Sequence, residues 1–301
     1  MNQSLFAEEY NQHIPLFFSK NKSGYVHSVF NNGLNIRMGS HLYFIGTTKN
    51  GQLPFGIHLD QQAIQLLVTI TKVETAVVWH DETEQLYFEN GLIIEMEKGN
   101  SYHNELHTVN ESKATILHNL ETFLSLLVNY GELTGLGVDI EQFMVDYATG
   151  EKNVSQKIDR LYTLMDAAFS DDQEKIENVV RYFLGRGEGL TPSGDDHIVG
   201  LLAIHAVTDA FHPMFIETIK KIVESESITT DVAKEYLTYA LQGEFGSPVS
   251  EVIMQLAQEG SINLEYSMLK LLPMGHSSGV DTAFGILIGI LTIRRKFNNG
   301  K

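Results

Sequence analysis

The chain of 301 residues contains no cysteine. This absence excludes disulfide bonds, thiolate nucleophiles and the cysteine ligands of zinc and iron–sulfur sites. An apolar run of about 20 residues, the length that crosses a bilayer, is also missing. So is a basic segment followed by an apolar one at the start of the chain, the pattern of a secretory signal. We therefore expect a protein without a membrane span that resides in the cytoplasm.

Positive charge is scarce as well. The sequence has 21 Lys and Arg against 38 Asp and Glu, a formal net charge of −17 at pH 7. Affinity for nucleic acids depends on Lys and Arg that neutralise phosphates, and anionic membrane surfaces attract the same side chains. The balance predicts neither a nucleic-acid partner nor a membrane partner. A small anionic substrate would need a local positive site, which the N-terminus of a helix can supply.

The period of the hydrophobic pattern changes once along the chain. From residue 24 to about residue 99, short apolar or alternating runs separated by turn residues predict strands. After residue 104, apolar residues recur every three or four positions, which predicts helices. The predicted fold class is α+β, with a β-rich N-terminal half, a small barrel or a sandwich, followed by an all-helical C-terminal half. We place two domains at residues 1–105 and 106–301.

The individual elements follow from the same patterns. Strands are predicted at 26–30, 34–38, 42–48, 55–59, 76–80, 86–90 and 92–97. Helices are predicted at 112–130 and near 138–148, 153–169, 171–184, 195–211, 213–225, 230–242, 248–259, 263–272 and 280–297. Residues 1–22 are weakly patterned and are interpreted as a short helix followed by a loop. The apolar run at 60–71 fits a helix or a strand.

The stretch from 184 to 200, LGRGEGLTPSGDDHIVG, interrupts two helical patterns with closely spaced glycines. Such a loop can deliver backbone N–H groups and side-chain oxygens to a helix N-terminus. GRGEG follows a helical pattern, whereas a dinucleotide-binding loop needs a preceding strand, and no G-x-x-x-x-G-K-[ST] sequence occurs. No histidine pair has H-E-x-x-H spacing. We expect no dinucleotide and no zinc.

Part of this stretch recurs later in the chain. SGDDHIVGLL, from Ser193, aligns without gaps to SGVDTAFGIL, from Ser278, and the shared phrase is S-G-x-D-x-x-x-G-[LI]-L. Both copies begin an apolar helix, and in both a glycine follows the aspartate by four residues, on the same helical face. Because glycine lets another backbone come close, the two helices are predicted to pack together with their N-termini side by side.

Two paired helix starts would form a concave site with unpaired N–H groups that attract an anion. Serine and threonine hydroxyls would add donors, and the aspartates could bind amide N–H groups or a divalent cation such as Mg²⁺. The candidate catalytic residues are Asp196, Asp281 and His276. The candidate substrate-binding residues are Arg186, Gly189, Thr191, Ser193, Gly194, Asp195, Ser277, Ser278 and Gly279.

Structural interpretations of the same residues remain open. Ser193 to Asp196 and Ser278 to Asp281 have the spacing of a helix capping box, with aspartate in place of glutamate. Arg186 could be a solvated surface charge instead of a bidentate partner for carboxylate or phosphate. Two copies of the phrase, one preceded by three glycines, favour the functional interpretation, because a cap needs neither a second aspartate nor so much glycine.

At these residues the chain resembles a known bacterial family, the one associated with the H subunit of oxamate carbamoyltransferase. The resemblance rests on LGRGEGLTPSGDDHIVG and GHSSGVDTAFG, and on VHSVFNNGLNI and LPFGIHL in the β-rich half. It implies that oxalurate (N-carbamoyl-oxamate) and phosphate are converted to oxamate and carbamoyl phosphate during anaerobic allantoin degradation. It also implies companion subunits. His197 departs from the family pattern, where an aromatic or aliphatic residue is expected.

Two hypotheses follow. In the first, the chain is a subunit of the carbamoyltransferase, with the site at the two S-G-x-D helix starts. There, N–H groups would stabilise the charge that develops in carbamoyl transfer, the aspartates would orient the ureido N–H groups, and His276 would move a proton. In the second, the chain is a non-catalytic subunit that senses a ligand or organises its partners, and it binds a small carboxylate or a nucleotide metabolite.

Overall fold

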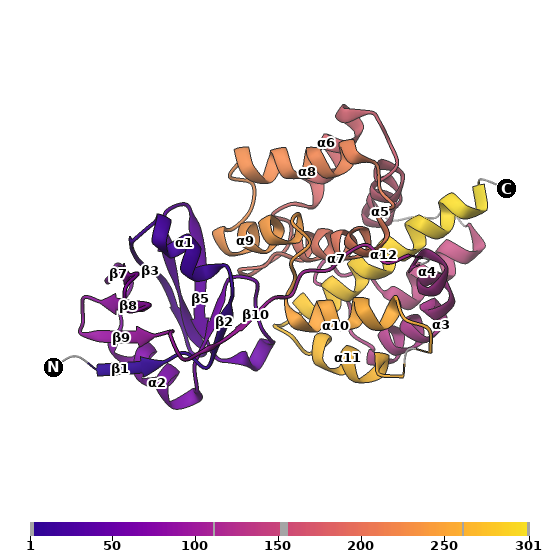
Figure 1. Cartoon of the computed structure of the whole chain (residues 1–301). Coiled ribbons are helices and arrows are strands. Elements are labelled where there is room, and N and C mark those ends of the chain that lie inside the picture. Colours follow the sequence, from indigo (N-terminus) through magenta and orange to yellow (C-terminus); the bar gives the residue numbers. More distant parts are fainter. Residues whose placement is uncertain (1–2, 111, 151–155, 261, 300–301) are drawn as a thin grey trace. The chain divides into compact units, whose positions relative to one another are not determined.

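A computed structural model describes residues 3–110, 112–150, 156–260 and 262–299 (Figure 1). The chain forms two compact units, Met1–Asn104 and Glu105–Lys301. Strands belong to the first unit, and the second consists of helices and loops, so the predicted α+β class is confirmed. Each unit is described by itself.

The first unit is built on one curled sheet of ten strands (Figure 1). They are β1 (Gln3–Phe6), β2 (Glu9–Asn11), β3 (Ser23–Phe30), β4 (Gly33–Met38), β5 (His41–Gly46), β6 (Gly56–His58), β7 (Ala76–His80), β8 (Gln85–Phe88), β9 (Leu92–Glu95) and β10 (Asn100–Tyr102). Their order in the sheet is β1-β9-β8-β7-β3-β4-β5-β6-β2-β10. Alternation sets the buried face: in β7, Val77 and Trp79 point into the core while their neighbours are exposed.

Strands β3 to β9 lie where the sequence predicts them. In residues 1–22 the predicted short helix is present as α1 (Ile14–Lys20), but the prediction missed the strands β1 and β2. β1 pairs in parallel with β9, and β2 pairs in parallel with β10. These partners lie far along the chain, so the local pattern could not reveal the strands. The ambiguous run at 60–71 is a helix, α2 (Gln61–Ile70), capped by the Asp60 side chain, and a short 3₁₀ helix, η1, covers Thr48–Asn50.

The second unit contains ten helices within the described residues. They are α3 (Ser112–Tyr130), α4 (Ile140–Thr149), α5 (Gln156–Ala167), α6 (Gln173–Phe183), α7 (Ser193–Thr208), α8 (Pro213–Ser225), α9 (Asp231–Ala240), α10 (Ser247–Leu256), α11 (Leu264–Leu271) and α12 (Ser278–Asn299). All lie near their predicted positions, although residues 153–155 of one prediction fall outside the described residues. In the described part of the chain, no helix has the length and apolar content to cross a bilayer.

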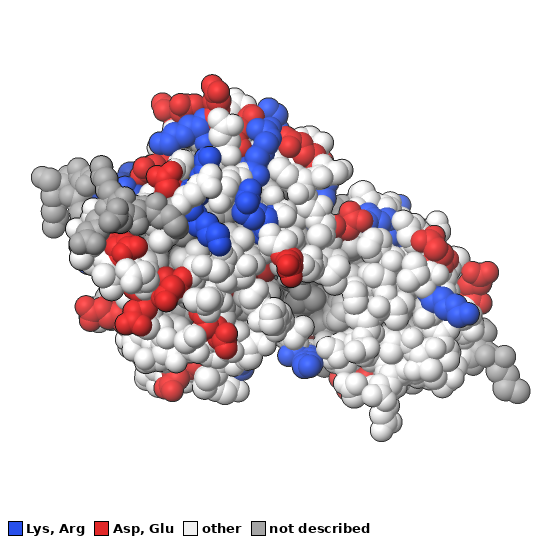
Figure 2. Space-filling model, turned by 180° about the vertical axis from the view of Figure 1, so that it is seen from behind, with Lys and Arg blue, Asp and Glu red and all other residues white. Residues whose placement is uncertain are grey.

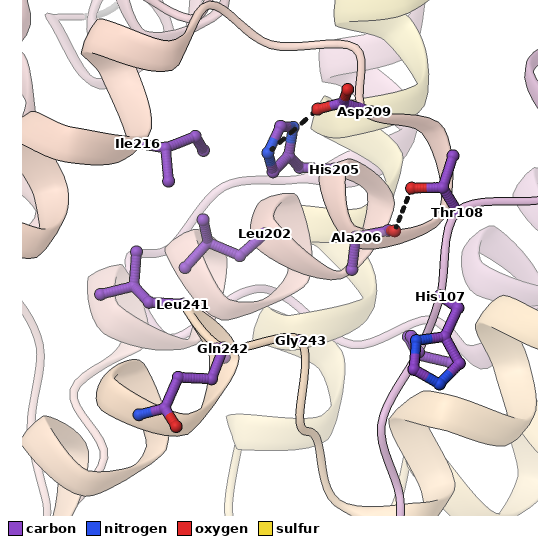
Figure 3. Close-up of a pocket in the computed structure, with 12 residues that line it drawn as sticks. His107, Thr108, Leu202, His205, Ala206, Asp209, Ile216, Leu241, Gln242 and Gly243 are labelled. Carbon is purple, nitrogen blue, oxygen red and sulfur yellow. Dashed lines mark hydrogen bonds and ion pairs between the residues drawn. The ribbon is translucent and has the colours of Figure 1, made fainter.

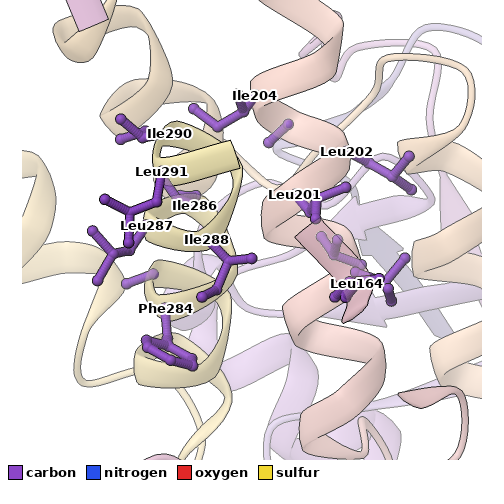
Figure 4. Packing of buried hydrophobic residues seen from close by; sticks show 14 of the residues in the cluster. Leu164, Leu201, Leu202, Ile204, Phe284, Ile286, Leu287, Ile288, Ile290 and Leu291 are labelled. Carbon is purple, nitrogen blue, oxygen red and sulfur yellow. The ribbon is translucent and has the colours of Figure 1, made fainter. Parts of the chain in front are cut away.

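Helices α7 and α12 form the centre of this unit and lie side by side (Figure 4). The first twelve residues of α7 are all buried, as expected for a helix that is apolar around its whole circumference. Glycines set the separation of the two helices: a methyl group on Gly200 would overlap the Thr282 carbonyl, and one on Gly285 would overlap the His197 carbonyl. The close approach expected from the repeated glycine therefore occurs.

The repeat extends to the helix that precedes each copy. A methyl group on Gly194 would overlap the Phe183 carbonyl oxygen at the end of α6. Gly279 has the same relation to the Leu271 carbonyl at the end of α11. In each copy the start of the central helix thus packs against the last turn of the helix before it, and both starts are fixed by backbone contact.

Candidate functional site

The glycine-rich loop between α6 and α7 turns sharply at three positions. Gly185, Gly187 and Gly189 have φ values of +71°, +125° and +87°, which side chains rarely tolerate. Gly187 packs against Ser193, and the Gly194 N–H donates to the Arg186 carbonyl at 2.8 Å. The loop therefore folds back on the first turn of α7.

Asp195 holds the glycine-rich loop in place through hydrogen bonds. Its carboxylate accepts the Gly185 N–H at 3.0 Å and the Thr229 hydroxyl at 2.8 Å. Burial raises the pKa of Asp195 to about 6, although these hydrogen bonds oppose the shift. Both carboxylate oxygens of Asp195 are engaged, so the contacts of this predicted binding residue hold the loop in place.

Asp196 lies in the same first turn but has a different environment. Its carboxylate interacts with the hydroxyls of Ser278 and Thr191, while its Oδ2 atom is buried without a hydrogen-bond partner among the described residues. Burial raises the pKa of Asp196 well above its usual range, and the Asp281 charge adds to the shift. The same burial raises the pKa of the Tyr236 hydroxyl, with a further contribution from the Asp196 carboxylate.

Asp281, in the first turn of α12, is completely buried. Its Oδ1 accepts the Gly135 N–H at 2.8 Å, and within the described ranges its Oδ2 has no partner. The Nδ1 atom of His197 lies 3.7 Å from Oδ1 of Asp281. Burial lowers the pKa of His197, and the nearby Asp281 carboxylate only partly opposes this. Burial therefore favours the neutral imidazole of His197, and among the described residues neither of its ring nitrogens has a hydrogen-bond partner.

The S-x-x-D phrase does not cap the first helix. The N-cap of α7 is Pro192, and no side chain accepts a hydrogen bond there. Ser193 is already inside the helix and is buried. The alternative interpretation of Ser193 to Asp196 as a capping box is therefore wrong for this copy.

A loop that the sequence analysis did not single out covers part of the site. Residues 131–139 join α3 to α4, and a methyl group on Gly135 would overlap Oγ of Ser193. The same methyl group would come 2.6 Å from Oγ of Ser277 and 2.9 Å from Oδ2 of Asp281. The Gly135 backbone thus brings together the hydroxyl of one helix start and the hydroxyl and carboxylate of the other. The T-G-L-G sequence between two helical patterns was the only local indication of this loop.

The remaining predicted residues lie at the edge of this arrangement. The Arg186 guanidinium is 3.9 Å from the centre of the Tyr182 ring, and its Nε donates to the Tyr182 carbonyl at 2.6 Å. Gly189 is exposed and has no non-neighbouring atom near the position of a Cβ. His276 is also exposed, directly before the half-buried Ser277 and Ser278.

Unpaired polar atoms concentrate at this site. In the described part of the chain, five buried side-chain N and O atoms lack a hydrogen-bond partner, and four of them belong to Asp196, His197 and Asp281. Buried polar groups in proteins are nearly always hydrogen-bonded to protein or ordered water, so a cluster of exceptions marks atoms that are available to a water, an ion or a ligand. The two carboxylate oxygens could accept N–H groups. The same carboxylate oxygens and the nearby hydroxyl oxygens are also ligands of the type that Mg²⁺ binds.

A pocket of about 270 Å³ lies elsewhere in the helical unit, at the C-terminal end of α7 (Figure 3). Leu202, Ile216 and Leu241 form apolar walls, and His205 lies among them. The Nδ1 atom of His205 accepts the Phe211 N–H at 3.4 Å, and burial lowers the pKa of His205. None of the predicted site residues lines this pocket.

The fold and the site define an α+β protein whose helical unit carries a buried polar site at the joined starts of two repeated helices. Sequence comparison then identifies its family. The family model described as oxamate carbamoyltransferase subunit AllH matches residues 183–290, which contain both copies of the phrase. The model described as the AllH family N-terminal domain matches residues 7–101. The chain belongs to the AllH family, as GLTPSGDD and GHSSGVD predicted. No solved structure matches the chain.

Proposed function

We propose that this chain contributes the site formed by the starts of α7 and α12 to an oxamate carbamoyltransferase. The reaction converts oxalurate and phosphate to oxamate and carbamoyl phosphate, as a cytoplasmic step of anaerobic allantoin degradation. Membership in the AllH family supports the assignment of this chain as a subunit of that enzyme. The observation that carries the assignment of the site is the pair of buried carboxylates, Asp196 and Asp281, each with one oxygen that has no partner among the described residues.

The site suits the nitrogen-bearing end of the substrate. A ureido group presents N–H donors, and the free oxygens of Asp196 and Asp281 accept them. Buried carboxylates left without partners are costly, so N–H donors would be bound in preference to bulk water. Hydroxyls of Ser193 and Ser277 lie beside Asp281 and can donate to the oxygen that becomes negative when the carbamoyl carbon turns tetrahedral. His276, exposed next to Ser277, would exchange a proton with the reactants.

The test is phosphorolysis of oxalurate by the enzyme assembled with its companion subunits. Asp196→Ala and Asp281→Ala should each abolish carbamoyl phosphate formation, measured by ³¹P NMR. Asp172→Ala is the matched control, because Asp172 is an exposed N-cap at the start of α6, outside the loop 131–139. Circular dichroism checks that the variants remain folded. Normal turnover in both site variants would show that the helix starts are not the site.

The second candidate function is a non-catalytic subunit that binds a small carboxylate or nucleotide metabolite, and the pocket at His205 is the observation that favours it. This function predicts a calorimetric binding signal for such a ligand and no carbamoyl phosphate, alone or with companion subunits. Loss of that signal in Leu202→Trp, which would fill the pocket, would separate it from binding at the helix starts.

A further inference from the structure

The candidate site has no cation among its buried residues, yet the proposed reaction uses a phosphate dianion. Within the site lie two carboxylates, a neutral histidine and hydroxyls. Asp196 and Asp281 repel a second anion. A phosphoryl group therefore needs positive charge at the edge of the site, in a protein whose formal net charge is −17.

Two arginines lie against one tyrosine at that edge. Cζ of Arg186 is 3.9 Å and Cζ of Arg160 is 5.0 Å from the centre of the Tyr182 ring. The two guanidinium groups are thus separated by no more than the sum of these distances. Stacking on the ring fixes the planar guanidinium groups and leaves donors in the ring plane: Nε of Arg186 donates to the Tyr182 carbonyl, and its terminal N–H groups remain to bind an anion.

A third cation extends the group. Lys157 precedes Arg160 by three positions on α5, so both lie on one face of that helix. Its Nζ donates to the Leu136 carbonyl, in the loop where Gly135 contacts the site. Figure 2 shows that Lys and Arg side chains gather on one face of the helical unit. We name Lys157, Arg160 and Arg186 the cation cluster.

The cation cluster is not neutralised by the described residues. No carboxylate within the described ranges forms an ion pair with any of its three members. Arg181, on the same helix as Tyr182, differs: it pairs with Glu177 and Glu226, each at 2.8 Å. Like charges held this close repel one another unless an anion lies between them. The cluster thus has the positive charge and the N–H donors that an anion site requires.

Two hydrogen bonds join the cation cluster to the candidate site, one between backbone groups and one from a lysine side chain. The Arg186 carbonyl accepts the N–H of Gly194, in the first turn of α7. The Lys157 ammonium donates to the carbonyl of Leu136. Leu136 follows Gly135, which lies against Ser193, Ser277 and Asp281. We propose that the cation cluster binds the dianionic phosphoryl group of inorganic phosphate and of carbamoyl phosphate. This proposal rests on the proposed function and assigns its phosphoryl subsite.

Calorimetric titration of the full chain with inorganic phosphate tests the subsite. Arg160→Gln and Arg186→Gln should each raise the Kd for phosphate about tenfold, because each removes charge-assisted hydrogen bonds. Arg181→Gln is the matched control, since Arg181 is already paired, and it should leave the Kd within twofold of wild type. Equal Kd values in wild type and both cluster variants would overturn the proposal, as would the absence of phosphate binding by the wild-type chain.

Kinetics of the assembled enzyme distinguish failure of the phosphoryl subsite from failure of the proposed function. The KM for phosphate should rise about tenfold in Arg160→Gln and Arg186→Gln, while the KM for oxalurate changes less than twofold. Turnover with an unchanged KM for phosphate would refute the subsite and leave the proposed function standing. Phosphate binding that depends on the two arginines, without any carbamoyl phosphate formed by the wild-type enzyme, would refute the proposed function and leave the subsite.

Discussion

Asp196→Asn should stabilise the helical unit at alkaline pH and remove activity at the same time. The side chain of Asp196 is buried, and its Oδ2 has no partner among the described residues. A carboxyl group that is a tenfold weaker acid in the folded state costs its ionised form about 1.4 kcal/mol. Asparagine keeps an acceptor for the Ser278 and Thr191 hydroxyls but places an amide where Oδ2 has no partner, so the gain comes only from removing the buried charge, about 1.4 kcal/mol for each tenfold weakening of the acid.

The stability difference between Asp196→Asn and wild type should depend on pH. Because burial raises the pKa of Asp196 in the folded protein, the folded state binds the proton more tightly than the unfolded state. Wild-type stability from this group is complete below the usual aspartate pKa and is lost as the pH rises through the folded pKa. Asparagine does not titrate, so the advantage of the variant should grow with pH and then level off. The raised pKa of Asp195 contributes equally to both proteins and cancels.

Urea unfolding between pH 5 and pH 9, followed by two probes, measures this. Circular dichroism at 222 nm reports mainly the helical unit, whereas fluorescence of Trp79, the single tryptophan, reports the sheet unit. Asp172→Asn is the control, because Asp172 is an exposed N-cap of α6 and asparagine caps equally well. A variant Asp196→Asn that is less stable than wild type at pH 8, or a gain independent of pH, would refute the reasoning.

Four other substitutions test the packing around the site. Gly285→Ala should destabilise the helical unit by about 3 kcal/mol or more, because its methyl group would overlap the His197 backbone; Gly289→Ala, which meets only the Ile204 side chain, should cost less in the same urea titration. Gly135→Ala should weaken oxalurate binding, measured by calorimetry, at least tenfold. It should leave the unfolding midpoint within a few degrees of wild type, because the exposed loop can shift. Unchanged binding would place the ligand elsewhere. Thr229→Val should cost about 1 kcal/mol by removing the hydrogen bond to Asp195, and no loss in thermal unfolding would argue against the loop being fastened there.

Local patterns predicted most of the fold. The apolar period of 112–130 matches α3 at both ends, and the repeated phrase located the starts of α7 and α12 to within three residues. β1 and β2 escaped detection because their backbone partners are β9 and β10, far along the chain. A strand of three or four residues carries too little periodicity to be recognised without its partner.

The candidate site could be proposed from the sequence only where its residues belong to a motif. Asp196 and Asp281 each lie in a copy of the repeated phrase. Gly135 and Arg160 come from segments with no motif, and only tertiary packing places them beside Ser193 and Tyr182. His197 departs from the family pattern, yet its ring packs against Phe183 and Phe284 and lies next to Asp281.

A crystal structure of the full chain with its companion subunits and bound oxalurate would test the assignment of the site most directly. The ureido group should lie between Ser193–Asp196 and His276–Asp281, with its N–H groups within hydrogen-bond distance of Asp196 Oδ2 and Asp281 Oδ2. Oxalurate bound in the pocket at His205, or at a site formed wholly by the companion subunits, would contradict it.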